Sequence, residues 1–427
     1  MRHLLCIPML FLLANPVALA ESDFIPDQPL RDAGLAKFWQ LQLPLDPGQE
    51  LRDAHLVDDQ LYLGTQDGFV FALHASTGVL RWLRPVTRPA YHIRRPCHAG
   101  ENTYFVTPTD IVVYDRRSGK PLDRRALRFP SGSSPLCDGE RLFIGGLDRR
   151  LYAFDIDTLY VAWKVVTNGP IASRPALRGD HVFAANNGGS IYACTRDKKV
   201  LHWKGQTFDS VTADLVVHEK HGVYVASRDL SLYLLDFDFG RIRWRARFSG
   251  PLYEAPIVTD ELAYQYCPDD GLVAVETAVI GAEERLRWKL PRGRTALTVH
   301  DGLAYILTKD ATIVAVDTKT GEVMSTLSAP GFTIAIPAPM SSTILVAAED
   351  GRVFCARPVG APPLLETDVL AALRPPAETP AETPVVEAET EKAASGPEDI
   401  LSTKRRGIPI GGKSKVTRSF KGEEESE

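Results

Sequence analysis

The sequence repeats itself with a period near 40 residues, and this period restricts the fold more than any other feature. The clearest unit covers residues 61–82 and contains two turn signals, Asp67-Gly68 and Thr77-Gly78, between runs of β-branched and aromatic residues. Such runs favour strands, and Asp-Gly supplies the positive-φ positions of a tight hairpin turn. Each unit is therefore predicted to read strand, tight turn, strand, turn, strand.

Two marks of this unit recur along the chain. The turn position holds Asp67, Asp110, Asp148, Asn187, Asp229, Asp270, Asp310 and Asp350. A second mark follows at Trp82, Leu122, Trp163, Trp203, Trp244, Trp288 and Met324. Eight repeats of about 40 residues predict a β-propeller of eight four-stranded blades. Because each blade buries its apolar surface against its neighbours, we expect the tryptophans to pack between blades and the turn carboxylates to form turns rather than a calcium site.

The two ends of the repeat region complement each other. The sixth tryptophan, Trp39, lies in an isolated strand-like segment near the N-terminus, and the eighth turn is followed by one more strand and then by proline-rich sequence. In the simplest arrangement the segment around Trp39 completes the last blade, which removes the sheet edges that an open ring would expose. Residues 36–358 are therefore predicted to form one all-β domain, an eight-bladed propeller closed by an N-terminal strand.

The unit over residues 61–82 resembles the pyrroloquinoline-quinone-like repeat, and residues 151–155 and 314–321 match its second half. In that family, quinoprotein dehydrogenases hold the quinone and calcium in a central site, and they are usually longer, with insertions between blades and a disulfide of adjacent cysteines. The nearly uniform repeats here are more similar to the non-catalytic propeller of the outer-membrane β-barrel assembly machinery. The sequence departs from that branch in lacking a lipidation cysteine after its first segment and in carrying a long C-terminal tail.

The first 20 residues have the parts of an export signal. A basic start precedes an apolar stretch of about 14 residues, and Ala18-Leu19-Ala20 forms a small-x-small cleavage site. The alternative is an uncleaved membrane anchor, but the stretch is shorter than the roughly 20 residues that span a bilayer. We predict a signal peptide at residues 1–20, a lead at residues 21–35, and export to the periplasm or the periplasmic face of the outer membrane.

Charge and cysteine content exclude several kinds of site. A net charge of -5 argues against a nucleic-acid binder, which needs a concentrated excess of lysine and arginine. The cysteines beyond the signal form an odd set, which implies at least one free thiol or an intermolecular bond, and we favour buried, inert thiols. They lack the short spacings of a zinc site, so no metal and no cofactor is predicted. These cysteines are Cys97, Cys137, Cys194, Cys267 and Cys355.

A candidate binding site follows from the geometry of propellers. The first strand of each blade lines the central channel, and its leading end opens at a funnel where partners or ligands dock. Several arginines and carboxylates fall there, and the planar fork of arginine suits carboxylates and phosphates. The alternative is a solvated mouth with local salt bridges. The candidate partner- or ligand-binding residues of the funnel mouth are Arg52, Asp53, His92, Arg94, Arg95, Arg174, Asp214, Glu254 and Arg294.

The repeat stops after Pro358, and the composition changes. Residues 359–374 are predicted to be a short helical connector, and residues 375–427 a disordered charged tail, since they are rich in proline and acidic residues. The basic segment at residues 404–421 is a candidate for peripheral contact with anionic envelope polymers or lipid, and the alternative is a solvated charge run.

These features predict a monomeric, exported, non-catalytic propeller that acts as a protein-interaction scaffold in the cell envelope, with a role in outer-membrane protein assembly. No Ser-His-Asp order or paired-carboxylate motif stands out, so no catalytic residue is predicted. The alternatives are a quinoprotein-type oxidoreductase dependent on pyrroloquinoline quinone, and a sensor propeller that binds a small ligand.

Overall fold

The computed structural model describes residues 23–361 except residues 90, 279–284 and 340. Contacts divide the chain into two units, Met1–Arg374 and Pro375–Glu427, and all of the described residues belong to the first. The predicted signal peptide, the predicted connector from residue 362 onward, the predicted tail and its basic segment lie outside the described residues.

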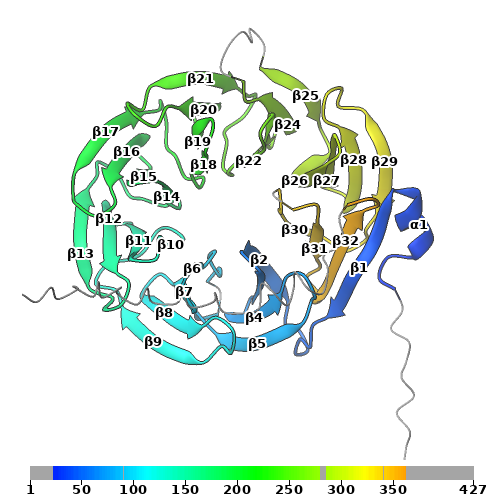
Figure 1. Ribbon diagram of the computed structural model, residues 1–427, viewed down its shortest axis with the longest axis horizontal. Coiled ribbons are helices and arrows are strands. Elements are labelled where there is room, and N and C mark those ends of the chain that lie inside the picture. The colour runs from blue at the N-terminus through cyan, green and yellow to red at the C-terminus, as the bar shows by residue number, and fades with distance from the viewer. Residues whose placement is uncertain (1–22, 90, 279–284, 340, 362–427) are drawn as a thin grey trace, which may run out of the picture. The chain divides into compact units, whose positions relative to one another are not determined.

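Eight four-stranded antiparallel sheets succeed one another around a central axis, which confirms the predicted eight-bladed propeller (Figure 1). In seven blades the strands run outward in chain order, whereas in the last blade β30, β31 and β32 are followed outward by β1; the outermost strand of each blade lies on the rim. Blades 1 and 2 contain β2 (Leu51–Val57), β3 (Gln60–Thr65), β4 (Phe69–His74), β5 (Leu80–Pro85), β6 (Cys97–Ala99), β7 (Asn102–Val106), β8 (Asp110–Asp115) and β9 (Pro121–Ala126). Blades 3 and 4 contain β10 (Leu136–Cys137), β11 (Arg141–Gly146), β12 (Arg150–Asp155), β13 (Val161–Val166), β14 (Ala176–Arg178), β15 (His181–Ala185), β16 (Ser190–Thr195) and β17 (Leu201–Gln206).

The second half of the ring follows the same order and ends with the blade that joins the two ends of the domain. Blades 5 and 6 contain β18 (Val216–His218), β19 (Gly222–Ser227), β20 (Ser231–Leu235), β21 (Ile242–Arg247), β22 (Ile257–Val258), β23 (Leu262–Cys267), β24 (Gly271–Glu276) and β25 (Leu286–Leu290). Blades 7 and 8 contain β26 (Gly293–His300), β27 (Leu303–Thr308), β28 (Thr312–Asp317), β29 (Val323–Ser328), β30 (Ile334–Ile336), β31 (Ile344–Ala347), β32 (Arg352–Pro358) and β1 (Leu35–Gln42).

Strand β1 closes the ring, as predicted. It pairs antiparallel with β32 and brings Trp39 opposite Cys355 and Leu41 opposite Val353. The short helix α1 (Asp27–Asp32), which the sequence analysis did not predict, precedes β1 and buries Leu30. Among the described residues, no helix has the length and apolar composition that crossing a membrane requires.

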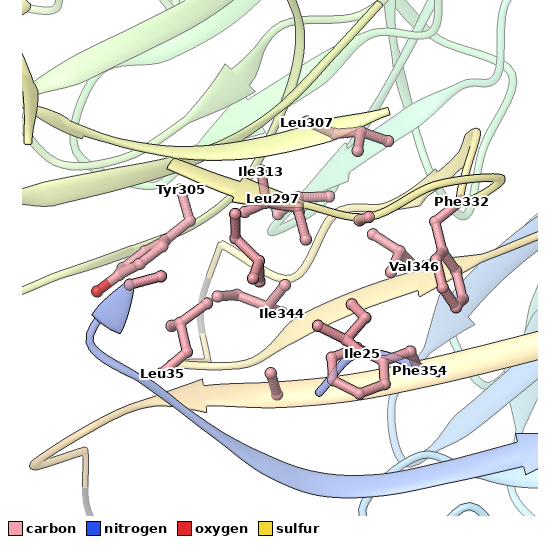
Figure 2. Close-up of a cluster of buried hydrophobic side chains, with 14 of the residues drawn as sticks. Ile25, Leu35, Leu297, Tyr305, Leu307, Ile313, Phe332, Ile344, Val346 and Phe354 are labelled. Atoms are coloured by element: carbon pink, nitrogen blue, oxygen red, sulfur yellow. The ribbon is translucent and has the colours of Figure 1, made fainter. Parts of the chain in front are cut away.

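The N-terminal segment also enters the core between blades 7 and 8. Ile25, Leu30 and Leu35 are each 1% exposed and belong to one cluster with side chains of both blades. Figure 2 shows Ile25 beside Phe354 and Leu35 near Ile344. Closure of the ring therefore depends on buried apolar side chains as well as on the hydrogen bonds of β1.

The tryptophans pack between adjacent blades, as predicted. The ring of Trp203 covers Gly240 of the next blade so closely that a Cβ on that glycine would lie 2.3 Å from it. Gly240 has a φ of 65°, a conformation that favours glycine. The Trp203 indole N–H also donates a hydrogen bond to the carbonyl oxygen of Phe237, 2.7 Å away. Trp203 thus contacts the outer turn of the neighbouring blade by ring packing and by one hydrogen bond.

Most of the other tryptophans make the same contact. Their indole N–H groups donate hydrogen bonds to backbone carbonyl oxygens of the neighbouring blade. The pairs are Trp39 with Ala75, Trp82 with Arg116, Trp163 with Arg196, and Trp288 with Thr318. Where Leu122 replaces tryptophan, the facing turn has Leu159 at a φ of 54° in place of glycine. The indole N–H of Trp244 is buried without a hydrogen-bond partner in the described part of the chain. The rim contact is therefore a property of most repeats in the part of the chain that the structure describes.

The acidic turn residues lie in hairpin turns, with one correction. Asp67, Asp148 and Asp229 fall between the second and third strands of their blades. Asp110 was predicted to occupy the same turn, but it is the first residue of β8. Thr107 forms that turn instead, because its hydroxyl accepts hydrogen bonds from the backbone N–H groups of Thr109 and Asp110.

Two of the five cysteines form a disulfide, so the prediction of inert thiols is wrong for Cys97 and Cys137. They lie on β6 and β10, the innermost strands of adjacent blades, and are separated by 40 residues. That separation is one repeat, so the two positions are equivalent and neighbouring. The remaining cysteines are free and buried; they are Cys194, Cys267 and Cys355.

Replacing both Cys97 and Cys137 by alanine is expected to lower the free energy of unfolding by about 2–4 kcal/mol, because the bond closes a loop of 40 residues in the unfolded chain. Chemical denaturation under oxidising conditions measures the change. A reductant should lower the midpoint of the wild type to that of the double variant and leave the variant unchanged. Equal midpoints without reductant would contradict the prediction.

Candidate functional site: the funnel mouth and the central channel

The predicted funnel residues occupy equivalent positions around the ring. They lie at the leading ends of the innermost strands or in the connections just before them, and we call the face that carries these connections the funnel face. Arg52 and Asp53 lie on β2, and Arg294 lies on β26. The others immediately precede β6, β14, β18 and β22. Because neighbouring positions are about 40 residues apart in sequence, residues of adjacent blades meet at the mouth.

Asp53 joins blade 1 to blade 2. Its carboxylate accepts a hydrogen bond of 2.7 Å from the backbone N–H of Ile93 and lies 2.8 Å from Nδ1 of His92. His55 on the same strand places its Nε2 2.7 Å from the carbonyl oxygen of Ile93. Burial lowers the pKa of His55, against the raising effects of this hydrogen bond and of Asp53. A neutral His55 therefore donates through Nε2–H to a backbone acceptor.

Two arginines connect blades 2, 3 and 4. Arg94 donates to the Ser131 hydroxyl at 2.7 Å and also to the carbonyl oxygens of Ser131 and Ser133. Arg174 donates through Nε to the carbonyl oxygen of Pro135 at 3.0 Å. Burial lowers the pKa of Arg94. Both side chains thus bond neutral backbone oxygens of the neighbouring blade, without a carboxylate partner in these contacts.

Asp214 on blade 5 lies at the centre of the charged residues. Its Oδ1 accepts a hydrogen bond of 2.8 Å from the backbone N–H of Arg174. Its charge opposes the lowering of the pKa of Arg94 by burial, and together with Asp58 it does the same for Arg95. Burial and then the charge of Arg95 lower the pKa of Arg174 to about 10, against the attraction of Asp214. Arg174 is thus tied to Asp214 of the next blade through its backbone N–H.

Glu254 and Arg294 form a paired unit between blades 6 and 7. The two guanidinium Nη atoms donate to the two carboxylate oxygens at 2.5 and 2.6 Å. Burial alone would lower the pKa of Arg294, but the hydrogen bonds and charge of Glu254 raise it above its ordinary value. The guanidinium also lies 4.1 Å from the ring centroid of Tyr266. Because both carboxylate oxygens and both Nη atoms already bond each other, the pair has little capacity to bind a further charged ligand.

A cavity of about 450 Å³ opens beside this pair in the channel. It extends from Glu254 and Arg294 past Tyr266 to His55 and Asp214, so blades 1, 5, 6, 7 and 8 contribute to its wall. The sequence analysis missed the lining residues on second strands and on the last blade. The missed polar and aromatic lining residues include Tyr264, Tyr266, Thr295 and Thr333. Tyr264 and Tyr266 lie on a second strand, Thr295 lies on a first strand and Thr333 precedes β30, so no single repeat position identifies them.

The predicted residues do not all join one site. Arg52 is exposed on β2 and does not line the cavity. His92 extends outward, with 69% of its side chain exposed, and is held by Asp53. Asp214, Glu254 and Arg294 line the cavity, whereas Arg95 and Arg174 do not. In the described part of the chain, no group of three or more His, Cys, Asp or Glu side chains could hold a metal ion.

Exposed aromatic side chains lie on the funnel face outside the mouth. Phe208 and Tyr253, in the connections that lead into β18 and β22, are 82% and 49% exposed. The guanidinium carbons of Arg245 and Arg228 lie 5.2 and 5.6 Å from the centroids of these two rings. We call Phe208, Tyr253, Arg228 and Arg245 the aromatic–arginine patch. Phe208 was missed in the sequence, where it occupies a turn position that holds Asn168 and Ser249 in the flanking repeats.

Comparisons with known proteins agree with this architecture. The family described as outer membrane protein assembly factor BamB matches residues 92–207 and 199–282. A comparison with curated proteins gives no match. Among solved structures, BamB from Moraxella catarrhalis is 15% identical, with a TM-score of 0.60 over 76% of this chain and 99% of that one. The computationally designed Ika8 protein is 13% identical, with a TM-score of 0.60 over 74% and 98% of the two chains. The chain thus folds as a propeller that resembles BamB, and residues 92–282 are similar to its family.

Proposed function

We propose that this protein is a non-catalytic, exported scaffold that docks protein partners during outer-membrane protein assembly, through the funnel face of its propeller. The observation that carries the proposal is the aromatic–arginine patch on a propeller that resembles an outer-membrane assembly factor. Exposed Phe, Tyr and Arg side chains on a rigid surface have the composition of protein-interaction hot spots.

The chemistry of the mouth supports a binding role rather than catalysis. The Asp53 and Glu254 carboxylates are held by hydrogen bonds from His92, Ile93 and Arg294. A general acid or base needs a side chain that can exchange a proton with a substrate, and carboxylates engaged in this way are poorly suited to do so. These contacts instead fix the blades relative to one another, which keeps the surface around the mouth rigid for docking.

Replacing Phe208 and Tyr253 by serine is expected to weaken partner docking by about tenfold or more, because hot-spot aromatics contribute about 2 kcal/mol each. The test is complementation in the native host after removal of the wild-type protein. We expect the amount of folded outer-membrane β-barrel proteins to fall on removal, to recover with the wild type, and to stay low with the double variant.

Phe239→Ser provides a matched control. Phe239 is 66% exposed and has the Arg241 guanidinium over its ring, but it lies in a turn on the opposite face of blade 5. This variant should restore the β-barrel proteins fully. If all variants restored the β-barrel proteins equally, the aromatic–arginine patch would not be the docking site. If the amount of β-barrel proteins did not fall when the wild-type protein was removed, the assembly role would be excluded. Dye-linked alcohol oxidation on addition of quinone and calcium would instead support the quinoprotein alternative.

A further inference from the structure

His98, on β6 of blade 2, contacts blade 1 through both of its ring nitrogens. Nδ1 lies 2.7 Å from a carboxylate oxygen of Asp58, in the turn between β2 and β3. Nε2 lies 2.7 Å from the hydroxyl oxygen of Tyr62 on β3. Only 5% of the His98 side chain is exposed, so water does not substitute for these partners. We call Asp58, Tyr62 and His98 the blade 1–2 joint.

The neighbouring side chains determine where the protons of the joint lie. Gln60 donates through its amide nitrogen to the carbonyl oxygen of Arg116 at 2.8 Å, which turns its amide oxygen toward Tyr62. That oxygen can only accept and is fully buried, so Tyr62 donates its single hydroxyl proton to it over 2.7 Å. The Tyr62 oxygen is then an acceptor for Nε2–H of His98, and the Thr103 hydroxyl can donate to it from 3.1 Å. Nε2 of His98 therefore carries a proton.

The carboxylate of Asp58 requires a second proton on His98. A ring nitrogen 2.7 Å from a carboxylate oxygen needs one proton between the two atoms. Asp58 has 62% of its side chain exposed, and the hydrogen bond from His98 is the main cause that lowers the pKa of this carboxyl group, so the proton belongs to Nδ1. With both nitrogens protonated, His98 is an imidazolium that forms a charge-assisted hydrogen bond with Asp58.

Other charged groups around the joint make the imidazolium dependent on Asp58. These groups are Arg81, Arg95, Arg116 and Asp59. Asp59 pairs with Arg81 and Arg116, so its carboxylate is already engaged. The positive charges of Arg95 and Arg116 lower the pKa of Asp58 less than His98 does, and they oppose a further cation. Asp58 is thus the group that favours the second proton of His98.

Histidines at the same repeat position of other blades lack this pattern. His300 of blade 7 lies 2.9 Å from the hydroxyl of Ser342, which can donate or accept, so a neutral ring satisfies the contact. His218 of blade 5 lies 3.2 Å from Asp260, but its Nδ1 is buried without a hydrogen-bond partner in the described part of the chain. Of these three histidines, only His98 needs both ring protons to satisfy its contacts.

We propose that His98 is a pH-sensitive latch: as an imidazolium it holds blades 1 and 2 together, and loss of its proton loosens the joint between them. A neutral ring would set Nδ1 against Asp58 or Nε2 against Tyr62 as two facing acceptors. If Tyr62 turned its proton to Nε2, the amide oxygen of Gln60 would lose its donor. One contact of the network is therefore unmade in every neutral form.

The direction of the pH dependence follows from the two charges of the latch. Histidine ordinarily loses its second proton near a pH of about 6.5, so the joint should weaken as the pH rises through neutrality. At strongly acidic pH the joint is also lost, when Asp58 is protonated below its lowered pKa. The Cys97–Cys137 bond ties β6 to blade 3, so the loosening lies on the side of β6 that faces blade 1. This property goes beyond the scaffold function, because it needs no partner.

NMR of the histidine ring nitrogens in the full chain, followed against pH, tests the latch. In the wild type both ring nitrogens of His98 should be protonated at mildly acidic pH. Asp58→Asn should lower the proton affinity of His98 at least threefold, about half a pH unit in its titration midpoint, because an amide can donate to Nδ1 of a neutral ring. His202, on the outer strand β17, should titrate alike in both proteins. An unchanged midpoint for His98, or an equal shift of His202, would overturn the proposal.

Chemical denaturation at two pH values measures the effect of the latch on the propeller. Between about pH 5.5 and about pH 8.5, the midpoint of the wild type should fall relative to that of Asp58→Asn, because only the wild type loses a charge-assisted bond. Comparing the two proteins at each pH cancels the groups that they share. An equal difference at both pH values would show that the His98 proton does not hold the joint. Neither experiment involves Phe208 or Tyr253, so failure here is distinguishable from failure of the scaffold proposal.

Discussion

A chain that begins at residue 44 is expected to lose the cooperative unfolding transition of the propeller. It lacks β1, so β32 becomes an open sheet edge, and Ile25, Leu30 and Leu35 leave the cluster between blades 7 and 8. Each fully buried aliphatic side chain contributes about 1.5–3 kcal/mol, and a whole domain is stable by only about 5–15 kcal/mol. The loss is therefore comparable with the total stability. Circular dichroism during chemical denaturation measures it.

A chain that begins at residue 23 is the control, because it keeps helix α1 and β1. It should unfold like the full chain. Adding a peptide of residues 23–43 to the shortened chain should restore a cooperative transition, since the peptide supplies the missing strand and its buried side chains. A shortened chain that unfolds cooperatively within about 1 kcal/mol of the full chain would contradict closure by β1 as a main source of stability.

Gly240→Ala is expected to lower the free energy of unfolding by about 2–5 kcal/mol. A left-handed φ costs a non-glycine residue about 1–2 kcal/mol, and forcing a methyl group into a packed contact adds about 1–3 kcal/mol. At Gly240 both apply, because φ is 65° and the new Cβ would lie 2.3 Å from the Trp203 ring. Chemical denaturation of the variant measures the sum.

Gly100→Ala separates the two contributions. Gly100 has a φ of 55° but no atom within 4 Å of a built Cβ, so this variant should lose about 1–2 kcal/mol from φ alone. A double-mutant cycle of Gly240→Ala with Trp203→Ala should show coupling, because removal of the ring relieves the collision. Equal losses for the two glycine variants, or additive effects in the cycle, would show that the Trp203 contact does not restrict position 240.

The sequence predicted the propeller because its repeat has local causes. The turn residues and the tryptophans recur at fixed positions, and an isolated segment with Trp39 complements an incomplete last blade. Asp110 was misplaced because Thr107 forms the turn in that repeat, a substitution that spacing alone does not reveal. Helix α1 was missed because it is short, and its main stabilisation is burial of Leu30 between blades.

The sequence predicted where the candidate residues lie on the blades, but it did not predict which side chains bond one another. Counting back from the turns located the residues of the funnel mouth, since equivalent positions lie at equivalent places in a ring. It did not show that Glu254 pairs with Arg294 while Arg94 bonds Ser131, because pairing depends on which side chains reach the neighbouring blade. The Cys97–Cys137 bond had a usable signal, a separation of one repeat, which marks two equivalent positions on neighbouring blades.

The pairing of β1 with β32 also sets an order of events during biosynthesis. Gln42 donates a hydrogen bond to Asp350, which lies 308 residues later in the chain. At a translation rate of about 5–20 residues per second, the first strand exists for roughly 15–60 seconds before its partner is made. Throughout that interval its apolar side chains and backbone groups are available to other chains. Chaperone binding to the nascent N-terminal segment would protect it until the final blade emerges.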